Sequence, residues 1–191
     1  LNGAVLFPGT SLPLNIFEPR YVEMVDFALS KKRLIGMIQT DNNGKLYKVG
    51  CVGKIHSFNE TNDGRYLISL QGTNCFRVVD EIKTEHKFRL FKVSIINNII
   101  DDVSDFSKYQ KTEILRKYKN FINLKNINLD LGEIDNIELS QLIKFIAMIS
   151  PFKDNEKQVL LETLDLKEFY NKLISIIELE IAEGDFNQSL N

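Results

Sequence analysis

The stretch PLNIFEPRY, residues 13–21, decides how the beginning of this chain folds. Pro13 fixes its own backbone and keeps its predecessor extended, so the apolar residues around it are expected in a strand. Pro19 suits the first position of a helix, where its missing N–H has no partner to lose, and Glu18 lies near the positive end of the helix dipole. Apolar residues then recur at helical spacing, which predicts a strand that leads directly into a helix over about residues 19–32.

Composition places the chain among ordinary globular proteins. Its 191 residues are 43% hydrophobic and 26% charged, which is enough to bury a substantial core. Lysine and arginine number 24 against 26 acidic residues, and this net charge of −2 argues against a dedicated nucleic-acid binder. No apolar run reaches the roughly 18 residues of a membrane span, and the start does not resemble a secretory signal, so we expect a cytoplasmic protein without membrane contact. Because the sequence starts at Leu1 rather than at methionine, we also expect that a short upstream segment precedes it.

Short strand-like segments follow one another between residues 34 and 95. One of them contains Gly50 and Gly53, and glycines inside a strand mark a bulge, a barrel corner or a close backbone approach. Gly72 likewise suits a turn or a bulge, and Asp63-Gly64 is a strong signal for a hairpin turn. Several short strands around one helix predict a small, barrel-like sheet with protected edges.

The second half of the chain has helical periodicity instead. Pro151 ends one predicted helix, and Asp165 and Glu168 have the spacing of a capping box for the last helix, with Gly184 as its expected end. The sequence therefore predicts an α+β fold in three parts. These are a β-rich subdomain at residues 1–100, a helical bundle at 101–186 and a tail at 187–191.

Motifs for catalysis and metal binding do not occur in the sequence. It contains no GxxxxGK[ST], GxSxG, HExxH or CxxC, and His56 and His86 are its only histidines. We therefore expect a protein that is not an enzyme and that uses neither a metal nor a cofactor. Cys51 and Cys75, the only cysteines, are interpreted as buried reduced thiols, with a disulfide or a reactive thiol as the alternatives.

Apolar residues are unusually dense around the first two turns, more than one short strand needs for its inner face. They are Phe7, Leu12, Leu14, Ile16 and Phe17. Exposed apolar patches on globular proteins often mark a partner or peptide site, so these five are our candidate polypeptide-binding residues. The alternative is that they fill the core of the sheet and the seam with the helical half.

Four segments of the chain resemble one known family. PLNIFEPRYVEMV, residues 13–25, resembles the opening of the LON substrate-binding domain, which stands at the front of ATP-dependent Lon proteases and also occurs alone. VGCVGKIHSF (49–58), LQGTNCFRVVD (70–80) and the helical stretch from DNEKQVLLE onward (154–181) resemble later family segments in the same order. One departure is Cys75, where the family usually has a basic residue.

The resemblance implies a PUA-like β pseudobarrel with one early helix, followed by a C-terminal α-helical bundle. The chain has no Walker motif and no protease segment, so it is similar to the stand-alone bacterial LON-domain proteins. We therefore expect a non-enzymatic module that binds unfolded or partner polypeptide. The alternatives are RNA or nucleotide binding, as in PUA-like barrels elsewhere, and a scaffold that regulates a separate protease. The net charge and the lack of an interleaved basic and aromatic strand argue against RNA.

Overall fold

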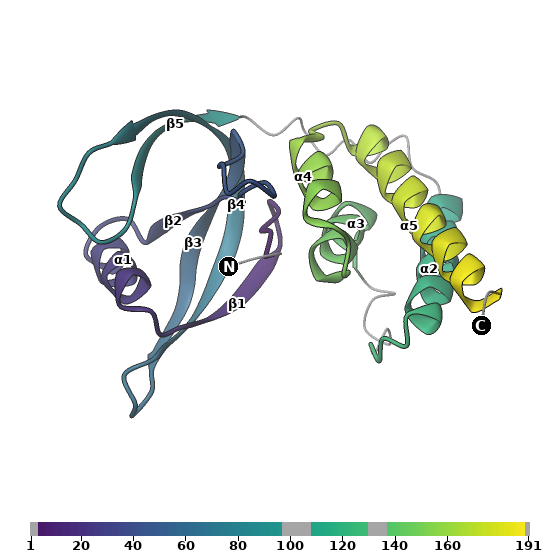
Figure 1. Cartoon of the computed structure of the whole chain (residues 1–191), viewed down its shortest axis with the longest axis horizontal. Helices are drawn as coiled ribbons and strands as arrows, with labels where there is room; N and C mark the ends of the chain where they lie inside the picture. The colour runs from purple at the N-terminus through teal and green to yellow at the C-terminus, as the bar shows by residue number, and fades with distance from the viewer. Residues whose placement is uncertain (1–3, 97–107, 130–136, 190–191) are drawn as a thin grey trace. The chain divides into compact units, whose positions relative to one another are not determined.

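The computed structural model describes residues 4–96, 108–129 and 137–189 (Figure 1). Contacts divide the chain into two compact units. The sheet unit comprises residues 1–98 and 148–162, and the helical unit comprises residues 99–147 and 163–191. The presence of an antiparallel sheet together with helices confirms the predicted α+β class. The pseudobarrel, the bundle and the three predicted subdomains stay predictions.

Five antiparallel strands lie among the described residues of the sheet unit. They are β1 (Ser11–Ile16), β2 (Leu34–Met37), β3 (Val49–Glu60), β4 (Tyr66–Ile82) and β5 (Leu90–Ile96). Their order is β1-β4-β3-β2, and β5 pairs with the second half of the long strand β4. The first half of β4 pairs with β1 over residues 66–71. The strand β4 is therefore the central element, since it pairs with β3 and with both β1 and β5.

The predicted passage from strand to helix is confirmed. Glu18 is extended, and helix α1 (Pro19–Leu29) begins with its proline in the first turn. The carbonyl of Glu18 accepts hydrogen bonds from the backbone N–H groups of Tyr21 and Val22. The helix ends slightly earlier than predicted, because the chain turns into the left-handed region at Arg33, whose N–H bonds back to the Ala28 carbonyl.

Glycines permit close backbone approaches inside the sheet unit, as predicted for Gly50. A Cβ at Gly50 would lie 2.4 Å from the Met37 carbonyl oxygen. Gly72 lies where the turn at residues 7–10 meets β4, and it exchanges backbone hydrogen bonds with Gly9 and Thr10 at 3.0 and 2.9 Å. A Cβ at Gly72 would lie only 2.1 Å from the carbonyl oxygen of Phe7. Any side chain at Gly72 would therefore separate this turn from the strand.

Helix α4 (Asp154–Glu162) belongs by its contacts to the sheet unit, although the sequence places it in the helical half. Leu160 and Leu161 are buried. The buried Gln158 side chain donates hydrogen bonds to the Val49 carbonyl at 3.1 Å and to Glu162 at 2.8 Å, and it accepts one from Gln39 at 3.1 Å. This polar network fixes α4 to β3.

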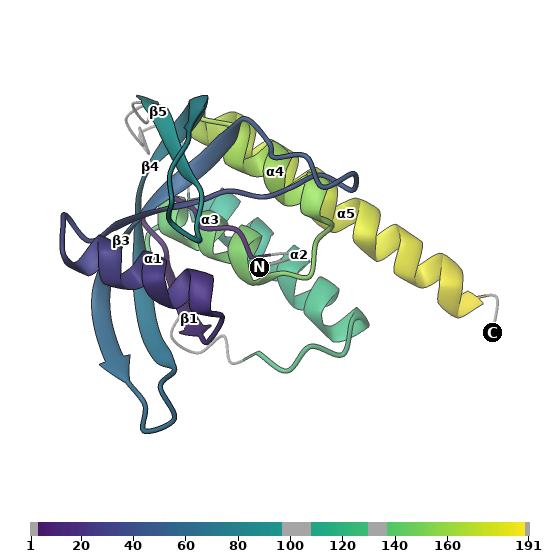
Figure 2. The same ribbon diagram turned by 60° about the vertical axis from the view of Figure 1, so that its left-hand side comes forward.

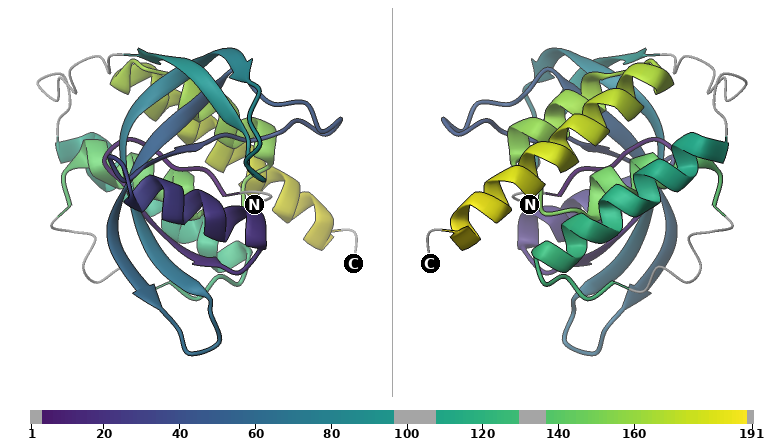
Figure 3. Two further views of the ribbon diagram at one scale, coloured as in Figure 1. Left: turned by 90° about the vertical axis from the view of Figure 1, so that its left-hand side faces the viewer. Right: turned by 90° about the vertical axis from the view of Figure 1, so that its right-hand side faces the viewer.

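The helical unit holds α2 (Lys108–Leu124) and α5 (Leu166–Ser189). It also holds residues 139–147 of α3 (Leu139–Ile149). Helices α2 and α5 lie side by side (Figure 3). The Tyr170 hydroxyl of α5 donates to the Gln110 carbonyl and to Glu113, both on α2. The prediction that the last helix ends at Gly184 is wrong, because a Cβ there would lie 2.4 Å from Leu124 and the glycine serves close helix packing instead. Among the described helices, none combines the length and apolar character that crossing a membrane requires.

Candidate polypeptide-binding surface

Successive side chains of β1 point to opposite faces of the sheet. Leu12, Leu14 and Ile16 lie on one face, and the polar face carries Ser11 and Asn15. Directly opposite residues in an antiparallel pair lie on the same face of a sheet. Leu12, Leu14 and Ile16 therefore share their face with their partners on β4, which are Leu70, Ile68 and Tyr66.

The structure places the five predicted residues in three environments. Phe7 and Ile16 are core residues, with 1% and 3% of their surface exposed. Leu12 and Leu14 are half-buried on the shared face of β1. Phe17, which directly follows β1, is 65% exposed. The structure thus leaves Leu12, Leu14 and Phe17 within reach of a partner, while Phe7 and Ile16 hold the sheet unit together.

Two aromatic residues that the sequence analysis missed extend this surface across the sheet. Phe58 of β3 lies opposite Ile68, which in turn lies opposite Leu14. The Phe58 side chain is 41% exposed. Its ring meets the ring of Tyr66 edge to face, with 4.9 Å between the centroids. We call Leu12, Leu14, Phe17, Phe58 and Tyr66 the apolar strip.

A bulge in β3 explains why Phe58 escaped prediction. Ile55 pairs with Leu70 and Ser57 with Ser69, so His56 is an extra residue in the strand. If β3 alternated strictly without a bulge, Phe58 would lie on the face opposite to Ile55. The predicted hairpin at Asp63-Gly64 was a usable signal for the strand, but it does not reveal a bulge.

One ion pair lies in the first residues after β1, next to Phe17. The side chains of Glu18 and Arg20 form an exposed ion pair at 2.9 Å, and the Arg20 guanidinium lies 4.5 Å from the centre of the Tyr21 ring. A hydrogen bond to Asp26 raises the pKa of the Tyr66 phenol. The strip therefore combines exposed apolar groups with the Glu18–Arg20 ion pair that follows β1.

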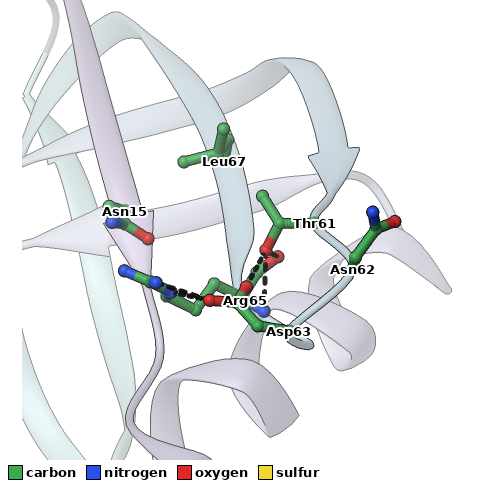
Figure 4. A pocket seen from close by; sticks show the side chains of 6 residues that line it. All are labelled: Asn15, Thr61, Asn62, Asp63, Arg65 and Leu67. Carbon is green, nitrogen blue, oxygen red and sulfur yellow. Dashed lines mark hydrogen bonds and ion pairs between the residues drawn. The ribbon is translucent and has the colours of Figure 1, made fainter.

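A hollow of about 470 Å³ lies on the other face, at the β3–β4 hairpin that projects from the sheet unit (Figures 2 and 4). It is lined by Asn15, Thr61, Asn62, Asp63, Arg65 and Leu67. The Arg65 guanidinium donates to Asp63 at 2.7 Å, and hydrogen bonds from Arg65 and Thr61 lower the pKa of Asp63 to about 2. Because the two charges of this hollow neutralise each other, it offers no unpaired charge to an ionic ligand.

Within residues 4–96, 108–129 and 137–189, no three His, Cys, Asp or Glu side chains gather as a metal ion would need. His86 bonds to Glu23 at 3.0 Å and stacks on Phe88 with 4.8 Å between the ring centroids. His56 lies exposed at the bulge of β3. His86 therefore has structural contacts, whereas His56 lies at the surface of the sheet unit.

Comparison with known proteins supports the same family as the sequence motifs. The family model described as the ATP-dependent protease La (LON) substrate-binding domain matches residues 1–178. Lon protease from Dictyoglomus thermophilum is 28% identical over 96% of this chain, and Lon protease from Halothermothrix orenii is 26% identical over 94%. The chain covers 24% of each of these proteins, so it spans about a quarter of the length of the curated relatives it matches.

Solved structures show the same fold at lower sequence identity. A Lon N-terminal domain protein from Xanthomonas campestris matches with a TM-score of 0.68 and 20% identity, covering 91% of this chain and 93% of the other. The N-terminal domain of a Mycobacterium avium complex Lon protease matches with a TM-score of 0.65 and 14% identity, covering 92% and 93%. With the family model matched over residues 1–178, the chain belongs to the LON substrate-binding domain family.

Proposed function

We propose that this chain is a non-enzymatic module that binds unfolded or partner polypeptide through the apolar strip of its sheet unit. The observation that carries the proposal is Phe17, a large apolar side chain that is 65% exposed and directly follows β1, the strand that carries the half-buried Leu12 and Leu14. Apolar groups of this size gain free energy when a partner removes them from water. The family name supports polypeptide as the class of ligand.

The geometry of β1 suits an extended polypeptide. Leu12 and Leu14 are two residues apart on one face, which is also the spacing of alternate side chains in a bound strand. Among the described strands β1 pairs only with β4, so its second edge carries backbone groups without a strand partner. An extended segment can use such an edge for backbone hydrogen bonds, while side-chain contacts supply selectivity.

We further propose that ATP hydrolysis and peptide cleavage are not activities of this chain itself, because the family match concerns a substrate-binding domain. In this proposal the sheet has the PUA-like pseudobarrel form, the helical unit is a bundle, and the protein acts in the cytoplasm. A separate protease is a candidate partner that would receive the bound polypeptide.

Phe17→Ala tests this function. If Phe17 is buried by the ligand, its loss is expected to weaken polypeptide binding about 10-fold to 100-fold, since burying a phenylalanine side chain contributes about 1.5–3 kcal/mol. Fluorescence anisotropy of a labelled, permanently unfolded polypeptide measures the dissociation constant. Because Phe17 is mostly exposed, we expect the variant to unfold at the same urea concentration as the wild type.

Leu179→Ala is the matched control. Leu179 is 61% exposed but lies on α5 of the helical unit, so its loss should leave the affinity unchanged. Equal weakening by both substitutions would contradict a site on the sheet unit. Binding to a labelled single-stranded RNA that disappears at high salt, without any binding of polypeptide, would instead support the RNA-binding alternative.

A further inference from the structure

Cys51 and Cys75 lie directly opposite each other on the adjacent strands β3 and β4. Their side chains therefore share one face of the sheet, and opposite Cα atoms of an antiparallel pair are about 4.5–5.5 Å apart. Disulfides join residues whose Cα atoms are about 4.4–6.8 Å apart. The two thiols thus have the backbone placement of a disulfide, although neither is in one.

Helix α4 covers this pair of thiols. The Cys75 Sγ donates a hydrogen bond to the Leu161 carbonyl of α4 at 3.7 Å. Gln158 of the same helix is bonded to the Val49 carbonyl, and Val49 lies on the same face as Cys51, two residues along β3. Cys51 and Cys75 are 0% and 2% exposed. Helix α4 therefore contacts the Cys75 sulfur directly and is bonded to the strand that carries Cys51.

Burial also keeps the reactivity of the thiols low while α4 is in place. Disulfide formation proceeds through the thiolate, and burial together with the neighbouring Cys75 raises the pKa of Cys51. Local opening of a folded protein can expose such a group without global unfolding. The polar network of Gln158 is what such an opening of α4 would have to break.

We propose that Cys51 and Cys75 are an oxidation site that closes to a disulfide when α4 lifts from the sheet. With a diazene oxidant such as diamide, one thiolate adds to the N=N bond, and the second thiolate attacks the resulting sulfenyl hydrazine at sulfur. The S–S bond forms as the S–N bond breaks. The two thiols lose two electrons and two protons, and the diazene takes them up to become a hydrazine.

Oxidation in turn weakens the contact between α4 and the sheet. A disulfide leaves Cys75 without the S–H that donates to the Leu161 carbonyl, which belongs to the last turn of α4, where helix carbonyls have no partner within the helix. If α4 in place disfavours the disulfide, then the disulfide must disfavour α4 in place to the same extent. The oxidation state of Cys51 and Cys75 is thereby coupled to the position of α4.

The test is oxidation of the purified chain by diamide, followed by alkylation, trypsin digestion and mass spectrometry. Cleavage after Lys48, Lys54, Arg65 and Arg77 puts the two cysteines on separate peptides, residues 49–54 and 66–77. A disulfide therefore appears as these two peptides joined, with the loss of two hydrogens. We expect slow formation in the wild type and formation at least about 30-fold faster in Gln158→Ala, because losing its buried hydrogen bonds favours local opening.

Asn155→Ala is the matched control, since Asn155 is an exposed amide on the same helix. The disulfide should form in this variant at the wild-type rate. Glu162→Ala removes one partner of Gln158 at the exposed end of α4 and should give a smaller acceleration. It serves as the test if circular dichroism shows Gln158→Ala to be unfolded. Oxidation at the wild-type rate in folded Gln158→Ala or Glu162→Ala would overturn the gating by α4. Oxidant adducts on single cysteines, without joined peptides, would overturn the pairing.

Discussion

Gly72→Ala is expected to lower the free energy of unfolding by about 3 kcal/mol or more, the range of severe overpacking in a protein core. The new Cβ would lie 2.1 Å from the carbonyl oxygen of Phe7, which is backbone and cannot move aside as a side-chain tip can. Separating the two segments would also break the hydrogen bonds that Gly72 makes with Gly9 and Thr10. Urea denaturation followed by circular dichroism measures the loss.

Gly44→Ala separates this clash from ordinary glycine effects. Gly44 has a φ of +77°, but an added Cβ there meets nothing within 4 Å. Its replacement should therefore cost only about 1 kcal/mol of backbone strain. If Gly72→Ala is no more destabilising than Gly44→Ala, the turn at residues 7–10 does not pack against β4 as described.

Gln158→Ala is the second substitution with a large expected effect. It leaves the Val49 carbonyl and the Gln39 amide without their Gln158 partner in a buried setting, and we expect a loss of about 2–4 kcal/mol. The variant should also exchange the backbone amides of α4 faster, which hydrogen exchange with mass spectrometry detects.

Asn155→Ala provides the comparison, because this exposed amide on α4 should change stability by no more than about 0.5 kcal/mol. Wild-type exchange of α4 in Gln158→Ala would show that hydrophobic contacts such as those of Leu160 and Leu161 suffice to hold the helix. The polar network would then not be what fixes α4 to β3.

Local chemistry made several features of the sheet unit predictable. Pro13 and Pro19, on either side of the segment LNIFE, predict the passage from β1 to α1, because each proline restricts the backbone in a known way. Asp63-Gly64 predicts the β3–β4 hairpin, and Gly64 does adopt a φ of +77° at the turn. These signals act within a few residues, so no knowledge of the rest of the fold is needed.

Features that depend on distant partners were beyond such reasoning. The helical spacing in α4 indicates that one side of the helix is buried but does not reveal that β3 covers it. Gly184 resembles a helix end because glycine is common there, yet it lies inside α5, where Leu124 approaches. Both cases need the tertiary partner to be known first.

The candidate surface was predictable only in part for the same reason. Hydrophobicity alone cannot separate Phe7 and Ile16, which are buried, from Phe17, which is exposed. Phe58 joins Leu14 across Ile68 only because of the bulge at His56. The apolar strip is thus a product of strand register, which the density of apolar residues near the start of the chain did not specify.

The most direct test of the proposed function is a hydrogen-exchange footprint of the chain saturated with an unfolded polypeptide. If the apolar strip binds the polypeptide, exchange should slow in residues 11–21 and 57–67 and stay unchanged in residues 166–180 of α5. Protection confined to α5, or no protection anywhere at saturating polypeptide, would contradict a binding site on the sheet unit.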